Sequence, residues 1–283
     1  MNEEIIKKID KIENLPTLPV LVTQLIKLLE DPKTTADDIN KLASKDIVLT
    51  TKILKLVNSA YYGFSKKIST LTQGIIILGF KTVKNLALSA SVFEMFKETE
   101  YKYFNAEQFW LHSIAVGFAA QIIGKYINYP NKEELFIAGI THDIGKLIMI
   151  KYFPDDFNKV IAILQENQNK SFYEVENEVL KYNHTDIGGA VVEKWNFPMI
   201  LVKAISSHHN LNEYKDYTIS GIIHISDVLV KTNRIGFSGD YKLPEFNKEL
   251  WEFLDLSSSN MKNILEELNN NSQKIKELLE ISL

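Results

Sequence analysis

Residues 138–150 of the chain read AGITHDIGKLIMI and place a histidine and an aspartate side by side within an apolar helical pattern. His142 falls in line with Leu135 and Ala138 at helical spacing, so its imidazole is expected to point into the core. Burying several unpaired imidazoles and carboxylates costs on the order of several kcal/mol. The stretch therefore predicts a helical core that contains polar groups, and it raises the question of what neutralises them.

The composition is that of an ordinary folded protein. The chain has 283 residues, of which 45% are hydrophobic and 24% charged, enough for one large core or two modest ones. Its formal net charge of -4 provides no basic field that would attract nucleic acid or anionic lipid. Cysteine is absent from the sequence, which excludes disulfides, thiolate metal ligands and a cysteine nucleophile. Arg234 is the only arginine, so lysines supply nearly all of the positive charge.

The sequence gives no signal for export or membrane insertion. The N-terminal residues MNEEIIKKID are partly acidic and lack the apolar core of a signal peptide. The best apolar run, IAVGFAAQIIG, is interrupted by Gln121 and falls short of the ~20 residues that a membrane span needs. Together with the absence of cysteine, these features predict a cytoplasmic protein that binds neither membrane nor nucleic acid.

Helix signals dominate the chain, and no alternation of apolar and polar residues reaches the length of a strand. Three pairs at capping-box spacing predict helix starts, namely Thr35 with Asp38, Asn105 with Gln108, and Ser171 with Glu174. Pro16 and Pro19 mark a further start. Prolines also predict helix ends at the residues that precede them, Asp31, Tyr129 and Phe197. We therefore predict an all-α protein.

Two segments interrupt the apolar periodicity and suggest domain boundaries. They lie near residues 98–105 and 236–244 and contain polar residues, glycine and tyrosine. We predict an N-terminal helical bundle over residues 1–98, a second helical bundle over residues 99–235, and a C-terminal helical appendage over residues 236–283.

The histidines are confined to the second predicted bundle. They are His112, His142, His184, His208, His209 and His224. Helical spacing aims several of them inward, together with Asp227, which falls between Ile223 and Val230. Neutral imidazole and carboxylate suit iron, manganese, zinc or nickel, and the set is large enough for two ions. The pattern therefore predicts a centre for one or two divalent transition metals.

Each residue also has a simpler interpretation. His112 or His184, taken singly, could be a hydrogen-bonded core residue, because most buried polar side chains are hydrogen-bonded. His208 and His209 could form an exposed helix end. His224 is expected to support its neighbours or the core rather than bind a metal. The set as a whole is nevertheless harder to obtain by chance than any one member.

The order of these residues, a histidine, the pair HD, a histidine, the pair HH and an aspartate, resembles that of the HD superfamily of metal-dependent phosphohydrolases. HDIGK, residues 142–146, is similar to the motif of the HD-GYP cyclic dinucleotide phosphodiesterases. LPTLP, ASKDIVLTTKILKLVNSAYYGF and TQGIIILGFKTVKNLALS resemble the HDOD family, the HD-related output domain of bacterial signalling proteins. The resemblance covers roughly residues 10–230. It implies an all-helical fold, with an N-terminal bundle packed on an HD-like bundle, used in signal transduction and often without catalytic activity.

The resemblance to the HD-GYP enzymes also implies a ligand set. Asp143 would bridge two ions, His112, His142 and Asp227 would complete one site, and His184, His208 and His209 would complete the other. In a working site the metals would activate a water that attacks phosphorus and would neutralise the developing charge. Lys146 would lie near a bound phosphate as a point charge, or it is a solvated lysine one helical turn after the motif.

The chain departs from the HD-GYP pattern after His209, where it reads NLNEYKDYTISG in place of the loop that holds the substrate. The match therefore supports metal binding better than cleavage of a cyclic dinucleotide. The favoured hypothesis is a signalling module that binds partner signalling proteins and retains a metal site. The alternative is an active metal-dependent phosphohydrolase with Asp143 and Lys146 as catalytic residues. A phosphate-containing or nucleotide ligand is compatible with both.

Overall fold

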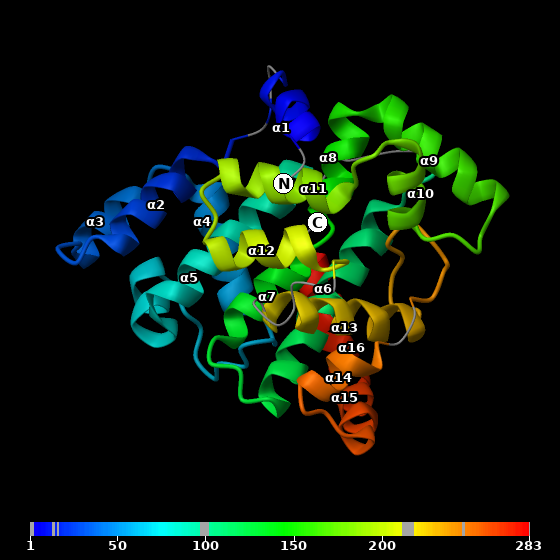
Figure 1. Ribbon diagram of the computed structural model, residues 1–283. Helices are drawn as coiled ribbons and strands as arrows, with labels where there is room; N and C mark the ends of the chain where they lie inside the picture. Colours follow the sequence, from blue (N-terminus) through cyan, green and yellow to red (C-terminus); the bar gives the residue numbers. More distant parts are fainter. Residues whose placement is uncertain are drawn as a thin grey trace. The chain divides into compact units, whose positions relative to one another are not determined.

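The computed structural model describes residues 3–12, 15, 17–96, 102–210, 218–244 and 247–282. Within these ranges every regular element is a helix and no strand is present (Figure 1). The expected all-α class is therefore confirmed. The helix start predicted at Pro16, the boundary predicted after residue 98 and most of the segment that replaces the HD-GYP loop lie outside the described residues.

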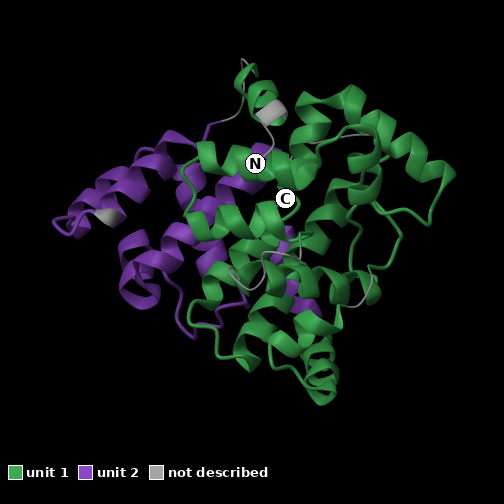
Figure 2. Cartoon of the chain, viewed as in Figure 1, with its two compact units in different colours: residues 1–15, 99–271 green, residues 16–98, 272–283 purple. Residues whose placement is uncertain are grey.

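The helices form two compact units (Figure 2). Unit 1 comprises residues 1–15 and 99–271, and unit 2 comprises residues 16–98 and 272–283. This grouping differs from the predicted one at both ends of the chain. The first helix belongs to unit 1, and the segment predicted as a C-terminal appendage is divided between the two units.

Unit 2 is built from five helices among the described residues, α2 (Val20–Glu30), α3 (Ala36–Ala43), α4 (Ile47–Val57), α5 (Leu71–Phe96) and α16 (Ser272–Ser282). Thr35 and Asp38 form the predicted capping box at the start of α3. α16 packs against α4 and α5, and the Glu277 carboxylate accepts a hydrogen bond from the Ala60 amide at 3.0 Å. The apolar face of this last helix thus completes the core that begins with α2.

α5 is long and apolar enough to cross a membrane by length and composition alone. The sequence prediction missed this helix, because it considered only the run interrupted by Gln121. Of the most apolar window of α5, 61% is buried inside the protein, and Gly79, with φ of 83°, interrupts the helical conformation. A helix of the protein core meets the same test, so we describe α5 as the core helix of unit 2.

Unit 1 contains the remaining helices. They are α1 (Glu3–Asp10), α6 (Ala106–Tyr126), α7 (Lys132–Thr141), α8 (Ile144–Tyr152), α9 (Pro154–Glu166), α10 (Phe172–Val179), α11 (His184–Lys194), α12 (Met199–Ser207), α13 (Thr218–Thr232), α14 (Lys248–Phe253) and α15 (Ser258–Asn270). Asn105 caps α6 by accepting a hydrogen bond from the Gln108 amide at 2.9 Å, and Ser171 and Glu174 form a capping box on α10. Both predicted starts are confirmed.

α6 is the central helix of unit 1 and packs against α7, α13 and α15. The crossing with α7 brings two backbones into contact at Gly117 and Gly139. A Cβ atom on Gly139 would lie 2.5 Å from the Gly117 Cα, and one on Gly117 would lie 2.8 Å from a ring carbon of Phe136. This close approach holds α6 and α7 at the separation at which the rings of His112 and His142 lie 5.5 Å apart.

The substitution Gly139→Ala is expected to destabilise unit 1 by roughly 1–3 kcal/mol, because backbone atoms that cannot move aside fill the space of the new methyl group. Gly74→Ala is the matched control. Gly74 is a helical glycine whose Cβ would meet nothing closer than 3.9 Å, so alanine there is expected to be neutral or stabilising. Urea unfolding followed by circular dichroism measures both changes, and an equal effect would refute a constraint at this crossing.

Candidate metal centre

His142 and Asp143 lie at the junction of two helices rather than within one. α7 ends at Thr141 with His142 as its C-cap, and α8 begins at Ile144 with Asp143 as its N-cap. The apolar pattern of residues 138–150 therefore covers two helices, which corrects the single helix expected from the sequence. A Cβ atom on Gly145 would lie 1.9 Å from the His184 carbonyl oxygen, so glycine at this position lets the start of α11 approach the junction.

The structure brings His112, His142 and Asp227 together in a first group. Their ligand atoms lie within 4.8 Å of one another, and all three residues are buried. The Nε2 atom of His112, on α6, lies 3.0 Å from Oδ1 of Asp227, on α13. These are the residues predicted to complete one metal site.

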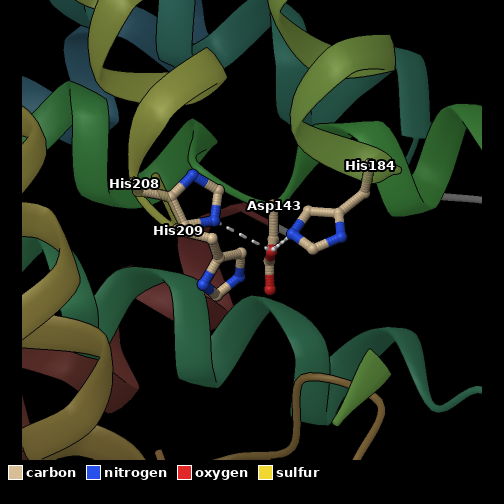
Figure 3. Close-up of side chains that lie close together, drawn as sticks. All are labelled: Asp143, His184, His208 and His209. Atoms are coloured by element: carbon tan, nitrogen blue, oxygen red, sulfur yellow. Dashed lines mark ion pairs between the residues drawn. The ribbon is translucent and has the colours of Figure 1, made fainter. Parts of the chain in front are cut away.

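A second group consists of Asp143, His184, His208 and His209, whose side chains point toward one another (Figure 3). Asp143 Oδ1 lies 3.1 Å from Nε2 of His184 and 3.7 Å from Nε2 of His208. The other carboxylate oxygen, Oδ2, lies 3.4 Å from Nε2 of His142, in the first group. Asp143 thus stands between the two groups, as a bridging carboxylate would.

His208 is fully buried and His209 partly buried, so the two do not form an exposed helix end. Several ligand atoms of the two groups are buried and have no hydrogen-bond partner among the described residues. They are the Nε2 atoms of His112, His142, His184 and His208, and the Oδ1 atoms of Asp143 and Asp227. Buried polar atoms are normally hydrogen-bonded. Their convergence without hydrogen-bond partners fits one or two divalent cations, which the atoms of each group would bind.

Hydrogen bonds on the opposite ring nitrogen orient three of these imidazoles. Nδ1 of His142 lies 2.7 Å from the Gly139 carbonyl oxygen, and Nδ1 of His208 lies 2.9 Å from the Ile205 carbonyl oxygen. A carbonyl oxygen can only accept, so Nδ1 carries the proton and Nε2 keeps its lone pair. This is the tautomer that a metal bound at Nε2 requires.

Glu176 plays the same part for His184, and the sequence reasoning missed it. Its carboxylate is fully buried and accepts hydrogen bonds from Nδ1 of His184 at 2.6 Å and from the His184 amide at 2.9 Å. A signal was present in SFYEVENEV, because Glu176 lies one helical turn after Phe172, on the buried face of α10. A carboxylate that binds the free nitrogen of a ligand histidine is a common feature of metal sites.

The charge states of three proposed ligands, His208, His209 and Asp143, suit metal binding, whereas the Glu176 carboxylate outweighs burial and raises the pKa of His184. Burial lowers the pKa of His208 from 6.5 to about 4, and it holds the pKa of His209 well below its ordinary value. Burial alone would raise the pKa of Asp143, but Lys146 and His142 outweigh it and hold this pKa well below the usual range. Neutral imidazoles and ionised carboxylates are the forms that ligate a metal.

Lys146 is buried, with 2% of its surface exposed, which excludes the interpretation of a solvated lysine. Its ammonium group donates hydrogen bonds to Oδ2 of Asp143 at 2.7 Å and to the Ser238 carbonyl oxygen at 2.9 Å. The lysine thus serves as the counterion of the central carboxylate.

His224 supports the second group, as expected. Its Nδ1 atom lies 2.9 Å from the His208 carbonyl oxygen, and the side chain is buried. The interaction connects α13 to the end of α12, where His208 and His209 lie.

Comparison with known proteins identifies the family and the fold. The family model described as the HDOD domain matches residues 15–211. A protein of Treponema pallidum (strain Nichols), described as uncharacterized, is 27% identical over 211 residues, which are 73% of this chain and 40% of that protein. The chain thus spans well under two thirds of the length of this relative.

Solved structures share the fold. An HDOD domain protein of unknown function from Geobacter sulfurreducens has a TM-score of 0.80 at 23% identity, over 99% of this chain and 97% of that one. A Shewanella amazonensis SB2B protein to which phosphohydrolase activity is ascribed has a TM-score of 0.75 at 20% identity, over 98% of both chains. A Marinobacter aquaeolei VT8 protein ascribed to signal transduction has a TM-score of 0.77 at 18% identity, over 99% of this chain and 64% of that one.

The substitution Glu176→Gln is expected to weaken metal binding by roughly 10- to 100-fold, because it removes the negative charge that raises the basicity of His184. Glu178→Gln, on the exposed face of the same helix, removes the same charge and is the matched control. Competition with a chromophoric zinc chelator measures both affinities. Equal affinities in the two variants would mean that Glu176 does not act on the metal centre.

The substitution Lys146→Met keeps the packing volume but removes the counterion of Asp143. It is expected to destabilise the metal-free protein by about 3 kcal/mol or more, the cost of leaving one member of a buried ion pair alone. Lys151→Met, an exposed position on the same helix, is the control. Thermal unfolding in the presence of a chelator compares the two, and similar midpoints would contradict a counterion role.

Proposed function

Because the chain belongs to the HDOD domain family, we propose that it is a bacterial signal-transduction module that acts through protein-protein interaction and retains an HD-type metal centre. The observation that supports the proposed metal centre is the convergence of buried ligand atoms without hydrogen-bond partners among the described residues. Many proteins keep a fold while losing its site. This chain keeps both groups of ligands.

The centre would bind one or two divalent transition metals, with iron, manganese, zinc and nickel as the candidates. The first group would hold one ion through His112, His142 and Asp227, and the second would hold the other through His184, His208 and His209. Asp143 would bridge them, since its two oxygens face different groups. Bound there, the metals would supply charge neutralisation and an acidified water.

Exposed apolar side chains in unit 2 support an interaction role. Val20, Ile47, Val48, Ile76, Ile77 and Phe80 are large hydrophobic residues that remain between 47% and 78% exposed. Where such residues form a contiguous patch, they often mark a site of protein-protein interaction, and these six are the candidates for one. A Marinobacter protein of the same fold is ascribed to signal transduction. The proposed partners are signalling proteins, with unit 2 providing the contact surface.

The second candidate function is a metal-dependent phosphohydrolase. It is favoured by the complete ligand set and by the partial exposure of His209, which gives the second group an edge toward solvent. In this reaction Asp143 would hold the metals, while Lys146 would orient Asp143 rather than contact the phosphate. The segment that replaces the HD-GYP loop argues for weak turnover, because a preorganised clamp normally contributes a thousandfold or more in rate, to order of magnitude.

Protein purified without chelator is expected to carry between about one and two transition-metal ions per chain. Elemental analysis tests this directly. Less than about a tenth of an ion per chain, an order of magnitude below one site, would contradict the metal centre.

The same preparation separates the two functions. We expect at most slow hydrolysis of bis-p-nitrophenyl phosphate and no efficient turnover of cyclic di-GMP with manganese, iron or zinc. Turnover of cyclic di-GMP above roughly one per second would reach ordinary enzyme rates. If Asp143→Asn abolished that turnover, the chain would be an enzyme and the signalling proposal would fail.

A further inference from the structure

The segment between α13 and α14 lies against the helices of the metal centre. The Phe237 amide donates a hydrogen bond to the Gln108 carbonyl oxygen at 2.9 Å, on α6. Asp240 accepts a hydrogen bond from the Phe172 amide at 3.1 Å, at the start of α10, and the segment runs up to α10 before it returns to α14 (Figure 1). The composition of residues 236–244 suggests a domain boundary, but hydrogen bonds hold the backbone of this region to α6 and α10.

This segment lines a cavity of about 380 Å³. The lining includes His112 from the first ligand group, and Lys231 and Arg234 from the end of α13. Cavities of ~300 Å³ and above are large enough for a small-molecule ligand. The cavity belongs entirely to unit 1.

The cavity lining contains three cations, Lys231, Arg234 and Lys242, and one carboxylate, that of Asp240. Lys242 is ion-paired with the Glu174 carboxylate, which is not part of the lining. Lys231 donates a hydrogen bond to Asp240 at 3.3 Å and lies 3.9 Å from Asp227, and these two carboxylates outweigh burial and raise its pKa, so it stays charged. Arg234, the only arginine of the chain, is exposed, and its guanidinium group makes no hydrogen bond or ion pair within the described residues.

Two polar atoms in the lining are buried without a partner. Ser238 is 2% exposed and its hydroxyl group makes no hydrogen bond within the described residues. Oδ1 of Asp240, a residue 8% exposed, likewise has none. A phosphate group satisfies both, because its oxygens accept from the serine hydroxyl and its remaining P–OH donates to the carboxylate.

A second cavity of about 270 Å³ adjoins the first, and Gln168, Phe237, Asp240 and Tyr241 line both. Its own walls include the aromatic or aliphatic residues Tyr103, Ile161 and Leu164 and the polar residues Gln165 and Lys170. The Phe237 and Tyr241 rings lie 4.7 Å apart between centroids. The paired cavities thus offer a compartment that contains Arg234, the cationic compartment, beside one whose walls are partly aromatic or aliphatic.

We propose that these paired cavities form a binding site for a small phosphate-bearing molecule with an aromatic or apolar group, beside the proposed metal ligands, of which only His112 lines the cavities. The phosphate occupies the cationic compartment, where Arg234 and the Ser238 hydroxyl bind it, and the apolar group packs on Phe237 and Tyr241. The site goes beyond the proposed metal centre, because none of its contacts to the ligand passes through a metal. Its position beside His112 gives a small molecule a route to influence the centre.

Titration calorimetry with phenylphosphonate, which has no hydrolysable ester bond, tests the site on the protein as purified. We expect saturable binding, and roughly three- to tenfold weaker binding of inorganic phosphate, which lacks the aromatic ring. The substitution Arg234→Gln should weaken phenylphosphonate by about tenfold or more, the effect of removing one charged hydrogen bond. Lys262→Gln, whose side chain is 79% exposed on α15, removes the same charge elsewhere and should leave the affinity unchanged.

The proposal is overturned if phenylphosphonate does not saturate below about 10 mM, a threshold near the weak end of specific binding. It is also overturned if the Arg234 and Lys262 variants bind alike. Repeating the titration with Asp143→Asn locates the ligand. Retained binding supports a site independent of the metal, whereas binding lost in this variant but kept in Arg234→Gln places the anion on the metal centre and refutes the proposal. Metal content, measured separately, tests the proposed function by itself.

Discussion

The structure of unit 1 depends on one constraint, the burial of imidazole nitrogens and carboxylate oxygens that have no hydrogen-bond partner among the described residues. An unsatisfied buried polar group costs on the order of 1–3 kcal/mol, so several in one place are a large fraction of the stability of a domain. Because of this cost, the positions of these atoms must be fixed by the packing of the helices. Each of the two groups receives its side chains from different elements, namely α6, α11, α13, the end of α12 and the junction of α7 with α8.

Two kinds of interaction hold this arrangement. Glycines at crossings let backbones approach, and Gly145 brings the His184 backbone to the turn that carries Asp143. Hydrogen bonds from Nδ1 then fix the direction of the rings, through backbone carbonyl groups for His142 and His208 and through Glu176 for His184. The ligand atoms are therefore positioned by contacts that do not involve a metal, so the centre is preorganised and little ordering is left to the binding step.

Helical periodicity and capping are local signals, and they were sufficient for the fold class and the capped helix starts. The division of the ligand residues into two groups came from the resemblance to the HD-GYP enzymes. The sequence was insufficient where a charged side chain is buried, because residues of this type are usually exposed. A lysine such as Lys146 is usually exposed, yet here it is buried and forms an ion pair with Asp143, three positions earlier. Glu176 stands among the acidic residues of α10, and only its place on the buried face distinguishes it.

Packing between segments that lie far apart in the chain could not be predicted from the sequence either. Nothing local to residues 272–283 indicates that they pack with α4 and α5 rather than with the helices just before them, because an apolar stripe specifies burial but not the partner. The contacts of the segment between α13 and α14 are long-range in the same way. Its glycines and polar residues are typical of a linker, whereas its hydrogen bonds to Gln108 and Phe172 hold it against α6 and α10.

Charge balance explains how such a core folds before any metal binds. Each carboxylate of the ligand set has a lysine close by, with Lys146 2.7 Å from Asp143 and Lys231 3.9 Å from Asp227. A buried carboxylate without a counterion would take up a proton, and a protonated carboxyl group is a poor ligand. The same lysines would limit the affinity of the proposed centre for a metal, because a positive charge a few ångströms away repels an incoming cation. Lys146 therefore keeps Asp143 ionised, and in the proposed centre it would also limit how tightly a metal binds.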